Sequence, residues 1–472
     1  MKRQLRQIVN AIATNRKGQT SPIVPILIAV IGMVVLGGWW YMRSSTKVAL
    51  RIHGSNTIGA ELGPAMVEAW LKSLGATDIK TKELKKEESQ IVASVPGESG
   101  PLVVEIFAHG SGTAFVDLAA GQCDIGMASR KIESKEAAAT VKLGDLTSIN
   151  GEHVIGLDGV AVIINKTNPV DNLSKDQLAR IFSGEASDWS VISNAFSGPI
   201  KLYARDDKSG TFDTFNSLVL KPRTIAKSAG RIEDSKELSA KVSDDAHAIG
   251  FIGLPYVLNA KPVAVYETET RNGRRISTRP LLPTKLTVAT EDYPLSRRLF
   301  FYTPANPENR WTRKLVDFAI SKAGQDIVGQ NGFVSQTPTL ETKDVHCEGC
   351  PARYQELTEN RNRLNLDFRF LSGKTALDNK AVVDINKVID LLFDLKYNSK
   401  GVVVLGFADN HGAADKNLQI SQDRASAVAD QFRSRGLTPE VIQGMGSEMP
   451  VASNDLPEGR EKNRRVEIWV RP

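Results

Sequence analysis

The sequence predicts an α/β protein with two soluble modules that follow one N-terminal transmembrane helix. Strand-like apolar runs alternate with helix-like segments from Val48 to about Val334, and a polar stretch then interrupts the pattern. A second, shorter alternation runs from about Asn365 to the end of the chain. Such alternation is typical of α/β modules. A chain of 472 residues holds roughly two to four domains of ordinary size.

The composition is that of a folded protein and excludes several classes. The chain is 41% hydrophobic and 24% charged, with 37 Gly and 21 Pro, which is unlike a disordered or repeat-built protein. The net charge of +6 mildly favours anionic partners. No stripe of Lys and Arg with interleaved aromatic residues occurs, so nucleic acid is not predicted as a partner.

The first element is a predicted membrane anchor, residues 23–42. The segment carries no charge and is long enough to cross the roughly 30 Å hydrocarbon core as a helix. Basic residues in 1–22 place that segment in the cytoplasm by the positive-inside rule. The apolar stretch ends in Trp-Trp-Tyr-Met without the small residues of a signal-peptide cleavage site. We therefore expect an uncleaved, single-pass inner-membrane anchor with the soluble modules in the periplasm of a Gram-negative bacterium.

The first soluble module contains three similar turns. In each, a predicted strand ends in a Gly/Ser/Thr turn and a predicted helix follows, at residues 54–57 (GSNT), 110–113 (GSGT) and 209–211 (SGT). Helix N-termini present unpaired N–H groups, and hydroxyls add further donors, so such turns can hold an oxyanion. Ser and Thr are also ordinary helix caps. Three turns at one edge of an α/β sheet nevertheless favour a shared anion site.

Enzymatic chemistry is not predicted. None of the three turns has the Lys that a nucleotide-binding P-loop requires. The six histidines are scattered, and no Ser, His and Asp group into a triad. An enzyme would need His53, His109 or His153 beside a nucleophile in a cleft. We predict no catalytic residues, no cofactor and no metal site.

Residues 48–338 resemble periplasmic solute-binding proteins of the phosphate-binding PstS type. The stretches that carry the resemblance are GSNTIGAELGPAMVEAW, HGSGTAFVDLAAGQCDIGMASRKI, GVAVIINKTNPVDNLSKDQLARIFSGEASDW, ARDDKSGTFDTF, HAIGFIG and GQDIVGQNGFV. The resemblance implies two α/β lobes, the second at about 161–245, with an anion held between them as the cleft closes. No permease or ATPase segment is present, so a transporter or a sensor would be a separate partner.

The resemblance also implies the ligands of the anion. The residues that match the family's R-x-D-x-S-G-T loop are Arg205, Asp207, Ser209, Gly210 and Thr211, and those that match contacts in the other lobe are Thr57 and Ser111. Arg205 would supply a charged fork of donors that Asp207 could orient.

One position departs from the family's pattern. Some phosphate-binding relatives place an acidic residue where Arg130 follows Ser129 in this chain. A carboxylate there accepts the proton of HPO₄²⁻, whereas Arg130 is a donor that would admit sulfate-like, tungstate-like or organic phosphate ligands as readily. The predicted ligand is therefore phosphate or a related oxyanion.

Residues 339–364 read as a polar linker that contains a CxxC motif. Cys347 and Cys350 have no second ligand pair at zinc-site spacing, and no His follows the second Cys as haem attachment requires. A loop disulfide is the favoured prediction for the periplasm, with free thiols and a metal as alternatives. Cys123 reads as a core residue.

Residues 365–472 resemble the OmpA-like peptidoglycan-associated domain. A strand–helix–strand–helix–strand–strand order leads to this prediction, and GFADNHG, NLQISQDRASAV, GMGSEMPVASN and EGREKNRRVEI carry the resemblance. It implies that Asp409 and Arg424 hold the ammonium and carboxylate of the wall peptide's diaminopimelate, with Asn417 as a polar contact. The family's His-Thr before the Asp is Phe407-Ala408 here, which removes a hydroxyl contact.

The predicted function is that of a membrane-tethered periplasmic oxyanion-binding protein that also binds peptidoglycan non-covalently. The alternative is an envelope structural or docking protein whose solute-binding-like module no longer binds ligand. A flagellar-stator-like role is excluded because residues 23–42 contain no carboxylate for proton flow.

Overall fold

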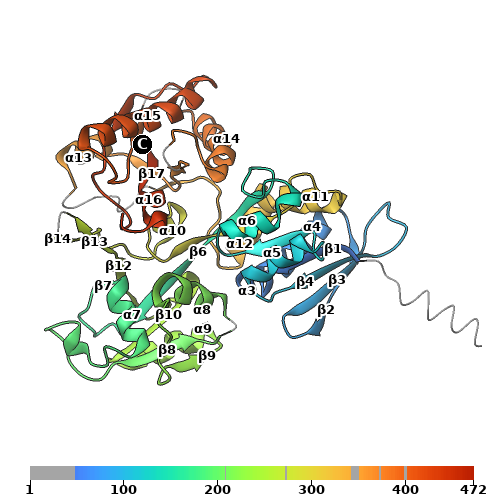
Figure 1. Ribbon diagram of the computed structural model, residues 1–472, viewed down its shortest axis with the longest axis horizontal. Helices are drawn as coiled ribbons and strands as arrows, with labels where there is room; N and C mark the ends of the chain where they lie inside the picture. The colour runs from blue at the N-terminus through green and yellow to red at the C-terminus, as the bar shows by residue number, and fades with distance from the viewer. Residues whose placement is uncertain (1–47, 208, 272–273, 342–349, 372–373, 398–400) are drawn as a thin grey trace, which may run out of the picture.

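The computed structural model describes residues 48–472 apart from 208, 272–273, 342–349, 372–373 and 398–400. Three α/β bodies make up this part of the chain, namely lobe 1, lobe 2 and a C-terminal domain (Figure 1). The predicted segments 1–22 and 23–42 lie outside the described residues. Within the described part, no helix combines the length and the apolar character that a membrane crossing requires.

Lobe 1 is a sheet with helices on its faces. Its elements are β1 (Val48–Gly54), α3 (Asn56–Gly59), α4 (Leu62–Ser73), β2 (Thr77–Lys85), β3 (Glu88–Ser94), β4 (Leu102–Phe107), α5 (Ser111–Ala119), β5 (Ile125–Ala128), α6 (Ser134–Ala139), α11 (Arg310–Ile320) and α12 (Lys322–Gln330). Trp70 of α4 packs edge-on against Trp311 of α11, with ring centroids 5.8 Å apart. The charged residues 80–90 lie on the exposed β2–β3 hairpin, where the charges protect the free edge of the sheet.

Lobe 2 is smaller and centres on a cluster of phenylalanines. Its elements are β7 (Asn172–Ser174), α7 (Lys175–Ser183), β8 (Lys201–Arg205), α8 (Gly210–Phe215), β9 (Gly230–Ile232), α9 (Ser235–Asp244), β10 (Ala248–Gly253), β11 (Lys261–Pro262) and β12 (Ala264–Tyr266). Phe215 and Phe251 stack at 4.0 Å in its core. Ser174 starts α7 with a capping box to Gln177, and Gly184 ends that helix in the left-handed conformation.

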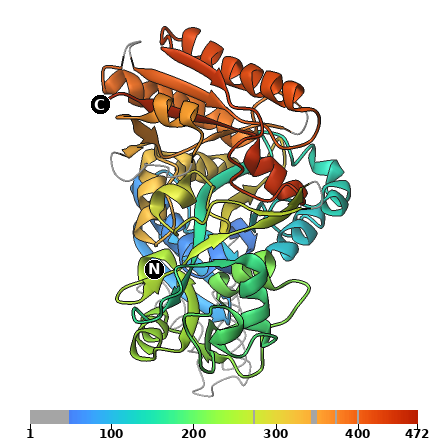
Figure 2. The same cartoon turned by 90° about the vertical axis from the view of Figure 1, so that its left-hand side faces the viewer.

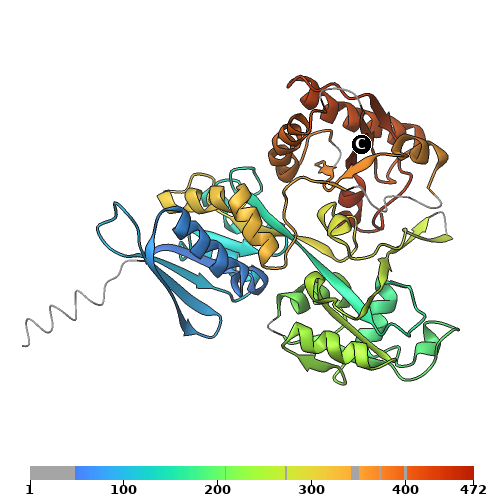
Figure 3. The same cartoon turned by 180° about the vertical axis from the view of Figure 1, so that it is seen from behind.

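The strands β6 (Glu152–Ile164) and β15 (Ser296–Tyr302) join the lobes. The sheet order in the described residues is β2-β3-β4-β1-β5-β15-β6-β10-β8-β9, so β6 and β15 lie in the middle. β6 pairs with β15 along its first half and with β10 along its second half, and Figure 3 shows it running from one lobe to the other. All of β6 is buried, as expected for a strand covered on both faces.

Three further elements lie near this crossing. They are α10 (Lys285–Ala289) and the hairpin of β13 (Thr268–Arg271) and β14 (Arg274–Ser277). The C-terminal domain rests against them, as Figure 2 shows.

The C-terminal domain is a six-stranded sheet in the described residues, with helices on both faces. Its elements are β16 (Leu340–Glu341), α13 (Ala352–Thr358), β17 (Asn362–Leu364), β18 (Phe368–Arg369), α14 (Asn379–Asp394), β19 (Val402–Gly406), α15 (Ala414–Arg433), β20 (Val441–Gly444), α16 (Pro457–Asn463) and β21 (Arg465–Val470). Helices α14 and α15 cover one face with Val388, Leu392 and Phe432, while α13 covers the other with Tyr354 and Leu357.

The linker prediction for 339–364 is wrong for much of that segment. β16 pairs with β17, and β17 pairs with β21, so these short strands extend the sheet of the C-terminal domain. α13 packs beneath the sheet through Tyr354. Each element contributes only a few buried residues, so the segment reads as polar although it belongs to the folded domain.

The CxxC motif straddles the limit of the described residues. Cys350 is disulfide-bonded. Cys347 lies outside the described residues, so the predicted pairing of these two cysteines stays a prediction. Cys123 is a free, buried thiol, as its core assignment required.

Candidate functional site

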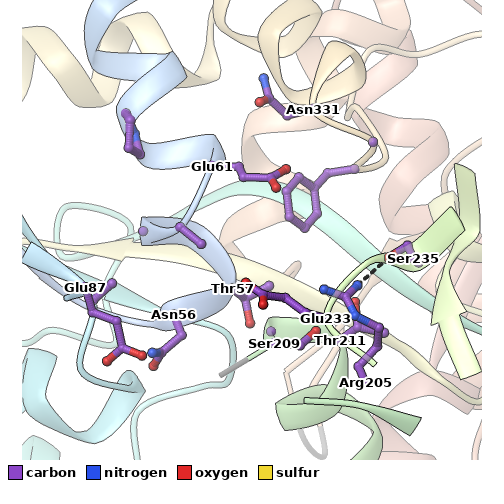
Figure 4. Close-up of a pocket in the computed structure, with 18 of the residues that line it drawn as sticks. Asn56, Thr57, Glu61, Glu87, Arg205, Ser209, Thr211, Glu233, Ser235 and Asn331 are labelled. Atoms are coloured by element: carbon purple, nitrogen blue, oxygen red, sulfur yellow. Dashed lines mark hydrogen bonds between the residues drawn. The ribbon is translucent and has the colours of Figure 1, made fainter. Parts of the chain in front are cut away.

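A cavity of about 630 Å³ lies between the two lobes (Figure 4). Lobe 1 contributes the start of α3 and Glu61, and lobe 2 contributes the β8–α8 loop and the start of α9. The predicted ligand residues that line it are Thr57, Arg205, Ser209, Gly210 and Thr211. Residues from sequence positions more than a hundred apart thus converge on one cleft.

The two lobes touch at the base of this cavity. The start of α8 lies so close to α3 that a Cβ on Gly210 would be 2.3 Å from Thr57 Cα. Only glycine permits this approach, because every other residue would place a side-chain carbon inside the backbone of α3. The Gly of the SGT turn therefore sets how far the cleft closes.

Arg205 is the cation on the cavity wall. It ends β8, and its guanidinium donates to the hydroxyl of Ser235 at the start of α9. Its Nε is buried and has no hydrogen-bond partner among the described residues. Arg205 thus retains donor capacity beside Ser209 and Thr211.

Ser111 and Ser129 form a second layer behind Thr57. The Ser129 N–H donates to Ser111 Oγ at 3.0 Å, and the two hydroxyl oxygens lie 3.1 Å apart. Ser111 opens α5 as the sequence predicted, but neither residue lines the cavity.

Arg297 of β15 joins Thr57, Ser129 and Gly210, and the sequence did not predict it. Its Nη2 donates to Thr57 Oγ1 at 2.6 Å and to the Gly210 carbonyl at 2.8 Å, while its Nη1 donates to Ser129 Oγ at 3.0 Å. The guanidinium is also paired with Asp158 at 3.3 Å, and that ion pair is buried. One side chain therefore binds both lobes at the base of the cavity.

This contact has a chemical consequence for the hydroxyls. Thr57 Oγ1 and Ser129 Oγ accept hydrogen bonds from Arg297, so each O–H is left to donate elsewhere. Ser129 donates to Asp213 Oδ2 at 3.4 Å. Thr57 lines the cavity, and its hydroxyl keeps its hydrogen for donation.

Arg130 does not enter the cavity. Its guanidinium makes a bidentate pair with Glu136 at 2.7 and 2.8 Å and lies over the Phe115 ring. The hydrogen bonds to Glu136 raise the pKa of Arg130. The cation that the sequence led us to expect at the ligand is therefore held by Glu136 of α6.

Asp207 also has a different partner from the one expected. It is 80% exposed and pairs with Arg231, so it does not orient Arg205. Arg231 stacks over the Phe212 ring at 4.2 Å.

The rest of the cavity wall is acidic. The carboxylates that line it are Glu61, Glu83, Glu87, Glu88, Asp158, Asp206, Glu233 and Asp234. An anion that enters meets this negative field, so its binding depends on directed hydrogen bonds at the base of the cavity and not on net charge.

The histidines that an enzyme would have used, His53, His109 and His153, do not line the cavity. No histidine or cysteine is among its described residues. His53 pairs with Asp117, and His153 is buried against Thr303. No group of three or more metal-ligating side chains occurs in the described part of the chain.

A second candidate site lies at the end of β19. Asp409 accepts from Arg464 Nη1 at 3.0 Å and from the His411 N–H at 3.0 Å. Arg464 itself is buried, at 7% side-chain exposure. The carboxylate is therefore held by an internal cation.

Arg424 and Asn417 lie on α15 beside this carboxylate. Arg424 is 2% exposed and donates to the carbonyls of Phe407 at 3.3 Å and Lys374 at 3.4 Å. Burial and the neighbouring Arg464 lower the pKa of Arg424 to about 10. Asn417 is buried about two turns before it on the same helix. Arg424 thus lies next to the residue that follows β19. The described contacts include no hydrogen bond between its guanidinium and the Asp409 carboxylate.

The fold and the two sites define a two-lobed solute-binding protein joined to an OmpA-like domain. A family model described as a PBP superfamily domain matches residues 89–323, and an OmpA family model matches residues 369–464. The chain belongs to the PstS-type family of the PBP superfamily and carries a C-terminal OmpA-family domain.

Two named relatives agree with this assignment. The chain is 30% identical over 239 residues to the protein SphX of Synechococcus elongatus, covering 49% of this chain and 68% of SphX. It is also 30% identical over 242 residues to the phosphate-binding protein PstS of Staphylococcus haemolyticus, covering 50% and 74%. The crystal structure of an ABC-type phosphate transport receptor from Vibrio cholerae aligns with a TM-score of 0.45 and 21% identity, covering 60% of this chain and 99% of that one.

Proposed function

We propose that this chain is a non-enzymatic oxyanion receptor of the cell envelope, with phosphate as its first ligand. The observation that carries the proposal is the convergence of Thr57, Arg205 and the Ser209–Thr211 turn at the base of one interlobe cavity. Neutral hydroxyl and N–H donors with one guanidinium suit a tetrahedral oxyanion. The relative from Staphylococcus haemolyticus is named a phosphate-binding protein, so we take phosphate as the first ligand to test.

The C-terminal domain would hold this receptor at the cell wall. Asp409 and the buried Arg424 offer opposite charges at one sheet edge, which fits the zwitterionic end of a diaminopimelate side chain. Residues 23–42 would tether the chain to the inner membrane, and a transporter or sensor would receive the ligand signal.

Isothermal titration of the full, ligand-stripped chain in detergent against phosphate, sulfate, tungstate and a phosphate monoester tests the receptor. We expect micromolar or tighter binding of at least one anion. Arg205→Ala should weaken it at least 100-fold, or by about 3 kcal/mol. Arg223→Ala is the matched control, because Arg223 is a lobe 2 arginine paired with Glu185 away from the cavity.

No heat from any anion with folded protein would reject the receptor and favour the docking-protein alternative. If Arg205→Ala and Arg223→Ala weaken anion affinity equally, Arg205 is not a ligand of the anion.

Co-sedimentation of the chain with purified peptidoglycan sacculi tests the wall grip. Asp409→Asn should lose binding, because the amide cannot attract the diaminopimelate ammonium. Asp430→Asn changes an exposed α15 carboxylate paired with Arg433 and should bind like the unmodified chain. Retained binding by Asp409→Asn would place the wall contact elsewhere.

A further inference from the structure

The C-terminal domain contacts both lobes of the binding cleft. On lobe 1, Asn379 donates to Glu152 Oε1 at 3.2 Å and to the Thr147 carbonyl at 2.8 Å. On the lobe 2 side, Glu267 accepts from the Ser453 N–H at 2.6 Å and from Lys175 of α7 at 2.8 Å. The domain therefore spans the two bodies whose relative motion opens the cleft (Figure 2).

The C-terminal domain also contacts β15 and the residues just before it, where the chain passes between the lobes. Arg298 of β15 donates two hydrogen bonds to Glu291 at 2.8 and 2.9 Å and one to Asp378 of the C-terminal domain at 2.7 Å. All three side chains are nearly buried. In the same place Lys462 donates to the Tyr293 carbonyl and to Ser296 Oγ, each at 3.2 Å.

Two adjacent arginines connect this interface to the ligand cavity. Successive residues of a strand point to opposite faces of the sheet. Arg297 therefore points to Thr57 and Gly210 at the base of the cavity, while Arg298 points to Asp378. A displacement of β15 on one face must move the side chain on the other.

We propose that the C-terminal domain is a strap that holds the two lobes in their closed arrangement, with the Arg297–Arg298 pair as the link between strap and cavity. The strap follows from the contacts alone, and its effect on ligand exchange rests on the proposed oxyanion receptor. Opening the cleft has to separate Thr57 from Gly210, which breaks the Arg297 bridge and strains the contacts of Glu152 and Glu267 to the C-terminal domain.

A C-terminal domain that holds the lobes closed should change the rates of ligand entry and release. A contact that stabilises the closed form slows both entry and release of a ligand enclosed by closure, and it raises the affinity of a ligand that binds the closed form. Loosening the strap should therefore speed release more than entry. The equilibrium affinity should weaken by the ratio of the two changes.

Asp378→Asn is the sharpest variant. Asp378 also caps α14 by accepting from the Ala381 N–H, and Asn preserves that cap while it removes the charge that faces Arg298. Lys462→Met is a second, independent loosening that touches no cap. Asp188→Asn is the matched control, because it changes a helix-capping aspartate on lobe 2 that contacts neither cavity nor strap.

Two readouts on the full chain separate the strap from the receptor. Spin labels on Lys82→Cys in β2 and Lys236→Cys in α9, both exposed, report the distance between the lobes without ligand. Stopped-flow exchange of phosphate reports release. We expect a broader, longer lobe distance and at least tenfold faster release in Asp378→Asn and Lys462→Met, with the control unchanged.

Unchanged lobe distances in both folded variants would overturn the strap, whatever phosphate does. If the unmodified chain binds no anion, the receptor fails while the distance measurement still decides the strap. Longer distances with unaltered phosphate release would overturn the link between strap and cavity.

Discussion

At the scale of single residues, the sequence predicts Thr57 and Gly210 at the base of the cavity but does not predict their contact with Arg297. Thr57 and Gly210 lie in Gly/Ser/Thr turns between a strand and a helix, so local pattern predicts them. Arg297 lies inside a strand, next to a second arginine, and its contact to Thr57 spans 240 positions. No local signal marks which of two adjacent strand arginines contacts Thr57 and Gly210.

Arg297→Met should abolish anion binding and destabilise the fold. The substitution removes the donor that orients the Thr57 and Ser129 hydroxyls, and it leaves Asp158 buried without its charge partner. An unpaired buried charge costs about 3 to 5 kcal/mol. Titration calorimetry and urea unfolding check the two effects.

The double variant Asp158→Asn with Arg297→Met separates these roles. It should recover much of the stability, because the stranded charge is gone, while anion binding stays lost. Recovery of binding together with stability would show that Arg297 acts only on the fold.

The buried His153 should make the chain less stable in acid. Burial lowers the pKa of His153 to about 4 from its ordinary 6.5. Between pH 4 and 6.5 the unfolded state binds more protons than the folded state, so stability is lost as pH falls through this window. At about 1.36 kcal/mol per pH unit, this histidine contributes about 3 kcal/mol of that loss.

Urea unfolding at pH 7 and pH 4 checks this prediction with His153→Gln, whose amide can still reach the Thr303 hydroxyl. The variant should lose less stability over the interval. An identical loss in both proteins would assign the acid sensitivity to other groups.

At the scale of elements, apolar periodicity located the modules but not every element. Ile385, Val388 and Leu392 recur at helical spacing on α14 and are buried, whereas Val382 in the first turn of that helix is 41% exposed. Short elements such as α13 and β17 bury too few side chains to give a periodic signal. The place of β17 in the sheet comes from pairing with β21, which lies about a hundred residues later in the chain, and α13 is placed by the packing of Tyr354 and Leu357 under the sheet.

The contact between the starts of α3 and α8 gives an element-scale prediction. Gly210→Ala places a carbon within 2.3 Å of Thr57 Cα, so the two lobes cannot reach their closed arrangement. We expect anion affinity to fall at least tenfold with little change in the thermal midpoint of either lobe. Gly329→Ala is the control, since a Cβ on that α12 glycine meets nothing within 4 Å. Equal affinities in calorimetry would contradict the close approach.

At the scale of the whole molecule, the docking of the C-terminal domain could not be predicted. Its interface consists largely of charged groups, such as Asp292 held by Arg363 at 2.8 Å and by Arg369 at 3.3 Å. Charged residues in a sequence read as solvated surface. Only the arrangement in space shows that these side chains are nearly buried against partners from another domain.

This docking predicts that wall peptide and anion influence each other's affinity. Asp409, the proposed wall-binding carboxylate, is held by Arg464, and Arg464 follows directly on α16, whose Lys462 contacts Ser296 next to Arg297. A diaminopimelate ammonium that competes for Asp409 would release Arg464 and disturb that helix. Because coupling between two binding equilibria is reciprocal, the factor by which wall peptide changes phosphate affinity must equal the factor by which phosphate changes wall-peptide affinity.

Calorimetric titration of each ligand at saturating levels of the other measures both factors on the full chain. We expect phosphate affinity to fall several-fold with a diaminopimelate-containing muropeptide, and both factors to approach one in Lys462→Met. A muropeptide with lysine in place of diaminopimelate lacks the second carboxylate and serves as the ligand control. Factors of one in the unmodified chain, with both ligands bound, would mean that the wall grip anchors the receptor without reporting to its cleft.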